Sequence, residues 1–218
     1  MSGRRPQAPP SAWRKMPWKN VPFASLDFEA TGLNFSKDTI ISFGVVPVTE
    51  GRIDVGDAVY QLVDPVDVPF DRQAIGVHML RPLDLVDAPS LEAAREALRA
   101  ALGRRFLITW FAEVEAAFLD KIFGGGRQRW MRRAVDVRRL VAELEGDVRG
   151  PLTLAACAER YQIPVADPHH ALDDALVTAQ LFLVTAAKLG ERGLHSVAEL
   201  ADAAPPAPLA LRRARPPW

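Results

Sequence analysis

Residues 23–30 read FASLDFEA, an apolar run that contains two carboxylates. Side chains alternate across a β-strand with period two, so Asp27 and Glu29 would share one face of a strand formed here. Two neighbouring carboxylates in a buried strand repel each other, and desolvating either one costs several kcal/mol unless a counter-charge is supplied. The stretch contains no lysine or arginine, whereas magnesium or manganese would suit oxygen ligands at this spacing. The alternative is an edge strand with two solvated acids.

The flanking sequence first continues the β pattern and then alternates helices with strands. Three apolar runs, at residues 21–30, 39–48 and 53–63, are separated by short turns and predict three strands in meander order. Later strands are expected at 106–110 and near 134–137, and helices at 91–102, 112–123, 137–144, 152–161 and 171–188. This order predicts an α/β fold with a mixed five-stranded sheet, as in the ribonuclease H-like architecture. Three antiparallel strands would precede parallel crossovers, with helices on both faces.

The composition of the 218-residue chain is typical of one globular domain with extensions. Hydrophobic residues make up 49% and charged residues 25%, and the single cysteine, Cys157, excludes a disulfide framework. No run approaches the roughly 18 apolar residues of a membrane span. We therefore expect a soluble, cytoplasmic protein with no membrane partner.

Charge is unevenly distributed, although 27 basic residues balance 27 acidic ones. The first twenty residues carry a net charge of +5 and residues 203–218 carry +3, which leaves −8 between them. Affinity for nucleic acid would therefore have to come from local patches, tails or bound cations. We expect a basic, proline-rich arm at 1–20 with little regular structure, a folded domain at 21–190, and a short helix with a Pro/Ala/Arg tail at 191–218. The tryptophans of both ends favour packing on the domain.

A third acid lies in the expected helix 112–123. At about 100° per residue, Glu115 falls within the apolar arc of that helix, whereas Glu113 falls on the opposite, solvated face. A helix used only as scaffold seldom places a carboxylate there, so Glu115 is expected to point into the body. A glutamate reaching solvent from the margin of the arc is the alternative.

Residues 169–174 read HHALDD at the start of the last long helix. Acids in the first turn favour the helix dipole and need no function. That explanation covers one aspartate, but not two aspartates together with a histidine pair. Periodicity does not choose between Asp173 and Asp174, because both lie between two apolar stripes.

The chain resembles a known family at several separated motifs. Residues 27–33 (DFEATGL) resemble the first motif of the DEDDh 3′-5′ exonucleases, the family of the proofreading epsilon subunit of bacterial DNA polymerase III. The pattern His-x-Ala-x-x-Asp at 169–174 resembles the third motif, and residues 74–78 and 136–140 resemble the segments between motifs. The resemblance covers roughly residues 21–187. It selects His169 over its neighbour His170 and Asp174 over Asp173.

The resemblance implies a set of catalytic and metal-binding residues. Asp27 would bridge two Mg²⁺ or Mn²⁺ ions, and Glu29 and Asp174 would complete the first ion. Glu115 would act mainly through water on the metal, and His169 would take the proton from the attacking water. The implied reaction releases nucleoside 5′-monophosphates from the 3′ end of DNA or RNA. The partners implied are a nucleic acid with a free 3′ end and, as an option, a DNA polymerase or another replication or repair protein.

The second motif departs from the family pattern. The family has His-Asn followed by an aspartate four residues after the asparagine, whereas this chain has Trp110, Phe111 and then Glu115. The loss of the asparagine removes an expected substrate contact. The two aromatics are candidates for stacking on a base, and buried core packing is the alternative.

Other candidate substrate contacts follow the first motif or precede the second. Thr31, Gly32 and Leu33 come directly after the metal-binding strand, where glycine permits close approach to a nucleotide. His78 is a further candidate at the border of the terminal nucleotide. An arginine run that follows a triple glycine offers phosphate contacts, or else a solvated, ion-paired face; its members are Arg127, Arg129, Arg132, Arg133, Arg138 and Arg139.

Two other functions fit the same residues. One is a catalytically decayed subunit that binds nucleic acid or associates with a polymerase, in which the Glu115 and aromatic replacements mark a lost activity. The other is a nuclease for very short oligonucleotides. The preference for DNA or RNA, and for single or double strands, stays open.

Overall fold

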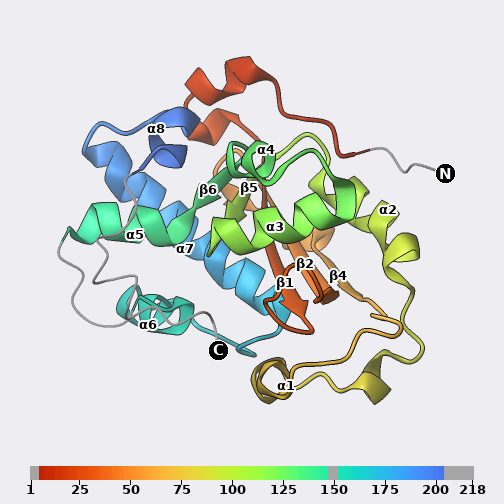
Figure 1. Cartoon of the computed structure of the whole chain (residues 1–218). Helices are drawn as coiled ribbons and strands as arrows, with labels where there is room; N and C mark the ends of the chain where they lie inside the picture. Colours follow the sequence, from red (N-terminus) through yellow and green to blue (C-terminus); the bar gives the residue numbers. More distant parts are fainter. Residues whose placement is uncertain (1–4, 147–151, 204–218) are drawn as a thin grey trace.

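The computed structural model describes residues 5–146 and 152–203. Its centre is a mixed sheet in the order β3-β2-β1-β5-β6, with β4 also paired to β2 (Figure 1). β1 pairs antiparallel with β2 and parallel with β5, and β5 pairs parallel with β6. The predicted α/β class and the change from antiparallel to parallel pairing are thereby confirmed. The strands are β1 (Phe23–Ala30), β2 (Ile40–Thr49), β3 (Arg52–Ile53), β4 (Val59–Leu62), β5 (Phe106–Thr109) and β6 (Ala134–Asp136).

The described sheet has six strands, so the expectation of five was wrong. The third apolar run, expected as one strand over 53–63, is interrupted by a 3₁₀ turn at Val55–Asp57. β3 therefore pairs with one part of β2 and β4 with another. Aspartate and glycine at the interruption favour a turn over continuous pairing.

Helices cover both faces of the sheet (Figure 1). Alternate β1 side chains, among them Leu26 and Phe28, pack with α2 and α3 on one face. Phe23, which points the other way, packs with α5 and α7. The short helices α1 and α4 were not predicted from the sequence. The α-helices are α1 (Arg72–His78), α2 (Leu91–Leu102), α3 (Ala112–Phe123), α4 (Arg127–Met131), α5 (Val137–Glu145), α6 (Leu154–Arg160), α7 (Ala171–Glu191) and α8 (Val197–Ala201).

Gly44 on β2 determines how closely α7 approaches the sheet. A Cβ atom at this position would lie 2.3 Å from the carbonyl oxygen of Ala171, which is the first residue of α7. Gly44 is also the antiparallel partner of Asp27 on β1. The missing side chain therefore lets the first turn of α7 lie against the two strands at the level of the β1 carboxylates.

Much of the basic N-terminal segment lies against α8. It forms 3₁₀ turns at Ser11–Lys15 and Trp18–Asn20, and Trp18 is 5% exposed. The Trp18 backbone N–H donates to the carbonyl of His195, and Arg14 pairs with Asp202 at 2.9 Å. The segment was expected to have little regular structure. In the structure its helical turns are short, and burial of the Trp18 side chain stabilises its packing on the domain. The predicted C-terminal tail beyond Ala203 lies outside the described residues.

Within the described part of the chain, no helix has both the length and the hydropathy needed to cross a lipid bilayer.

Candidate active site

Asp27 and Glu29 lie on a central strand. β1 is flanked by β2 and β5, so the alternative of an edge strand with two solvated acids was wrong. Both carboxylates belong to the β1 face that α7 covers, opposite the apolar Leu26 and Phe28. Glu29 is 4% exposed. The strand therefore places two acids where water cannot fully solvate them.

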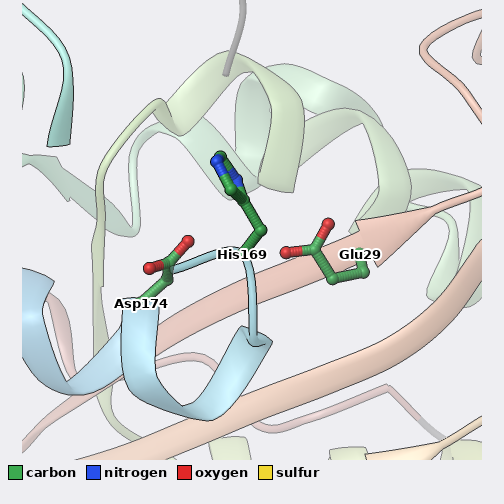
Figure 2. Close-up of side chains that lie close together, drawn as sticks. All are labelled: Glu29, His169 and Asp174. Atoms are coloured by element: carbon green, nitrogen blue, oxygen red, sulfur yellow. The ribbon is translucent and has the colours of Figure 1, made fainter. Parts of the chain in front are cut away.

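The start of α7 brings a third acid and a histidine to the same place. One ligand atom from each of Glu29, His169 and Asp174 lies within 4.8 Å of the others. Figure 2 shows the two carboxylates reaching toward each other from β1 and α7, with His169 on the loop that precedes the helix. His169 has φ of 64°, in the left-handed region, so this loop is held in an unusual conformation for a non-glycine residue. Side chains 140 residues apart in the sequence thus form one compact group.

His170 and Asp173, the sequence neighbours of His169 and Asp174, do not belong to this compact group. His170 lies 3.2 Å from Asp173, and its ring stacks on Tyr60 with centroids 4.2 Å apart. These two side chains therefore form a local pair at the helix start. Packing thus separates the two histidines and the two aspartates, which periodicity could not do.

Asp27 and Glu115 face the same cavity without belonging to that compact group. The cavity has a volume of about 350 Å³, and both acids line it together with Glu29, His169 and Asp174. Glu115 is 4% exposed, and its Oε2 atom has no hydrogen-bond partner. Glu115 therefore points into the body, as its place in the apolar arc predicted.

The electrostatics of the cavity favour the arrival of positive charge. Burial raises the pKa of Asp27 well above its ordinary value, and repulsion from the other three acids adds to the rise. Burial and then Asp174 raise the pKa of Glu29 in the same way. Burial raises the pKa of Asp174 to about 7. No arginine or lysine among the described residues opposes these three shifts, so a divalent cation fits this group of ligands.

His169 is suited to accept a proton. Burial lowers its pKa from the ordinary value, which keeps the ring neutral near pH 7. A neutral imidazole beside carboxylates has a free lone pair for a water molecule in the cavity.

A second group of charges, from α3 and the start of α5, lies beside the cavity. Arg139 donates to Glu113 at 2.9 Å, and Arg138 lies 3.7 Å from a carboxylate oxygen of both Glu113 and Asp136. The Glu113 side chain is 32% exposed, so it is partly solvated as expected, but its pairing with two arginines was not expected. The helix period located its face correctly, but α5 brings two arginines against that face.

Asp136 was not predicted as part of the site. It is the N-cap of α5, accepting from the Arg139 N–H at 3.2 Å, and it also accepts from the Ala112 N–H at 3.3 Å. It thereby joins the starts of α3 and α5, and burial raises its pKa to about 6. An acid directly before an expected helix is an N-cap signal, which could have identified it.

The candidate substrate contacts divide into two sets. Leu33, Trp110 and Phe111 line the cavity, whereas Thr31, Gly32 and His78 are not among its lining residues. The hydroxyl of Thr31 donates to Asp38 at 3.2 Å and accepts from the Thr39 N–H. A Cβ atom on Gly32 would lie 2.4 Å from the Asp38 carboxylate. Thr31 and Gly32 therefore shape the turn after β1.

His78 is also held within the protein. Its side chain is buried, and Nδ1 accepts from the Leu80 N–H at 3.0 Å. Burial lowers its pKa from the ordinary value. This environment gives it a part in the conformation of the loop after α1.

A family model described as exonuclease (RNase_T) matches residues 25–182, which include the β1 acids, Glu115 and the start of α7. The chain belongs to the RNase_T exonuclease family. This finding confirms the resemblance seen at the separated motifs.

A curated relative of this exonuclease chain is the PolC-type DNA polymerase III of Thermotoga petrophila. The two are 27% identical over 187 residues, which is 84% of this chain and 13% of the polymerase. The chain thus spans only about an eighth of the length of that relative.

Solved structures share the fold. E. coli Exonuclease I in complex with a dT13 oligonucleotide superposes with a TM-score of 0.68 at 13% identity, covering 79% of this chain and 42% of that one. The nuclease domain of 3′hExo, a DEDDh family member bound to rAMP, superposes with a TM-score of 0.61 at 17% identity, covering 76% and 91%. The ribonuclease H-like architecture predicted from the sequence is therefore confirmed.

Proposed function

We propose that the chain is a divalent-metal-dependent 3′-5′ exonuclease that releases nucleoside 5′-monophosphates from DNA or RNA. The observation that carries the proposal is the convergence of Glu29, His169 and Asp174 within 4.8 Å in a cavity that Asp27 and Glu115 also line. Exonuclease family membership supports the reaction class. The 3′-5′ direction rests on the resemblance of the motifs to the DEDDh enzymes.

Each acid has a distinct part in this proposal. Asp27, Glu29 and Asp174 would hold two Mg²⁺ or Mn²⁺ ions, and Glu115 would complete the ring of negative charge from the α3 side. Such ions, when bound, supply charge that stabilises the attacking and leaving oxygens of a phosphoryl displacement. The same charge would offset the repulsion that raises the pKa of Asp27 and Glu29.

His169 would act as the general base. It would accept the proton of the attacking water, because its neutral ring lies within 4.8 Å of two carboxylates that would hold the ions. Leu33, Trp110 and Phe111 would contact the terminal nucleotide, since they line the same cavity. Trp110 is only 7% exposed, whereas Phe111 is partly exposed. Phe111 is therefore the more accessible ring for stacking on a base.

A second candidate substrate is a very short oligonucleotide. The cavity volume of about 350 Å³ lies at the lower end of the range for ligand pockets, which suits one terminal nucleotide. Comparison of a dinucleotide with a 20-mer at equal concentration of 3′ ends would separate the two. Association with a DNA polymerase is a further hypothesis, supported by the PolC-type relative alone.

The decisive experiment is degradation of a 5′-labelled oligonucleotide with Mg²⁺ or Mn²⁺, with single-stranded DNA, double-stranded DNA and single-stranded RNA in parallel. A ladder that shortens from the 3′ end, with 5′-monophosphates as product, is expected. Asp174→Asn should abolish it, whereas the matched variant Asp173→Asn should leave most of the activity. Retained nucleic-acid binding without turnover under any ion would favour a decayed subunit instead.

A further inference from the structure

Arg138 has a position that the ion-pair network does not account for. Its side chain is 3% exposed and it lines the cavity. Its Nε atom has no hydrogen-bond partner, and the nearest carboxylate oxygens, of Glu113 and Asp136, lie 3.7 Å away. That separation exceeds hydrogen-bond distance. The Nε atom is itself enclosed, so a ligand in the cavity would meet the terminal N–H groups of the guanidinium. Buried donors are nearly always satisfied, and a phosphate oxygen would satisfy these groups.

The guanidinium is held in place by an aromatic ring. It lies over Phe111, 3.7 Å from the ring centroid. The N–H bonds of a guanidinium lie in its own plane. Stacking its face on an aromatic ring therefore leaves these N–H groups free to donate hydrogen bonds sideways. Phe111 occupies the position at which the family pattern has asparagine. The Arg138 guanidinium that stacks on Phe111 thus places a hydrogen-bond donor beside the position where the asparagine side chain is missing.

The adjacent Arg139 shows the contrast. Its Nε atom also lacks a hydrogen-bond partner, but a terminal N–H group donates to Glu113 at 2.9 Å. Its side chain is 24% exposed, and it is absent from the lining of the cavity. Among the residues that the structure describes, Arg138 is the one arginine or lysine that lines the cavity. The acids of the cavity repel those phosphates of a nucleic acid that do not contact a bound ion. A fixed positive charge in the lining of the cavity would offset that repulsion.

We propose that Arg138 positions the substrate by donating to a phosphate oxygen of the nucleic-acid strand that enters the cavity. The inference rests on the proposed exonuclease function and adds a substrate contact specific to this chain. Arginine suits this task because its planar fork matches phosphate oxygens and stays charged at all working pH values.

The test measures KM and kcat of wild type and Arg138→Gln on a labelled 20-mer at several salt concentrations. KM should rise about tenfold or more, as for one charge-assisted hydrogen bond, with a smaller change in kcat. The slope of log KM against log salt should fall by about 0.7, the value for one phosphate contact on a single strand. Arg139→Gln is the matched control and should leave KM and the slope unchanged.

Two further variants keep the test decisive if Arg138→Gln fails to fold, which thermal unfolding would reveal. Arg138→Lys keeps the charge and should raise KM by a smaller factor with an unchanged salt slope. Arg138→Met keeps the length of the side chain without its charge and should raise KM and lower the salt slope. Wild-type KM in both variants would overturn the proposal.

The outcomes also separate this inference from the proposed function. Absence of cleavage by wild type would refute the exonuclease itself. Cleavage by wild type with an unchanged KM and salt slope in Arg138→Gln would refute only the role of Arg138. Equal effects on dT, dA and dC homopolymers support a phosphate contact, whereas an effect confined to one base would overturn it.

Discussion

Two groups of acids, one lining the cavity and one beside it, differ in how their charge is balanced. Glu113 and Asp136, at the starts of α3 and α5, have Arg138 and Arg139 within 4 Å. The β1 and α7 acids have no arginine or lysine among the causes of their pKa shifts. The charge of the first group is balanced within the protein, whereas the charge of the second would be balanced only by bound cations. Glu115 lies between them and is affected by Arg138.

The largest expected effect comes from neutralising an acid of the unpaired group. Asp27→Asn should lower kcat by at least about a thousandfold, because it removes a proposed ligand at the centre of the site. The same change should raise Tm of the metal-free protein, since it removes a buried charge that repels its neighbours. Activity assays and thermal unfolding in chelator would measure both. Undiminished cleavage would contradict the proposed mechanism.

Metal removal should act on the unpaired group alone. Chelator should abolish cleavage, and added Mg²⁺ or Mn²⁺ should restore it and raise Tm through binding to the folded state. The matched comparison is a Glu29→Gln, Asp174→Asn double variant, whose Tm should respond little to either ion. An equal rise in Tm for this variant would show that the ions bind elsewhere.

The pH dependence should differ between metal-free and metal-loaded protein. Burial raises the pKa of Asp174 to about 7 from an ordinary value of 3.8, so the folded state holds a proton that the unfolded state releases. This contribution to stability is complete below about pH 4 and is lost as the pH rises toward 7 and beyond. Tm of the metal-free protein should therefore fall over this range. In the Asp174→Asn variant the fall of Tm with pH should be smaller. An equally steep fall would show that other groups cause the pH dependence.

The smallest expected effect comes from the paired group. Glu113→Gln removes the 2.9 Å ion pair with Arg139, which is partly solvent-screened and contributes about 1 kcal/mol at most. Tm should fall by about 2–4 °C with kcat nearly unchanged. Neutralising an acid should thus lower Tm here and raise it in the β1 and α7 group. A rise in Tm for Glu113→Gln would remove the distinction between the two groups.

Local patterns predicted much of the fold because strand and helix periods depend on neighbouring residues alone. The alternation in β1 placed Asp27 and Glu29 on one face, and the apolar arc of α3 placed Glu115 toward the interior. The third strand was predicted as continuous although Asp54, Gly56 and Asp57 provide a turn signal inside the run, where the structure has a 3₁₀ turn at Val55–Asp57. The partners of Glu113 could not be predicted, because they come from α5, some 25 residues further along the chain.

The sequence by itself determined which faces carry charge and which motifs are present, since both follow from residue order within single elements. Tertiary packing decided which of these groups meet. Gly44 admits the start of α7 to the sheet, so Asp174 joins Glu29 while Asp173 turns to His170. The close approach of α5 and α3 likewise directs Arg138 to the cavity and Arg139 to Glu113. A short-range pattern contains no information about the distance between two elements, and the chemistry of this site depends on that distance.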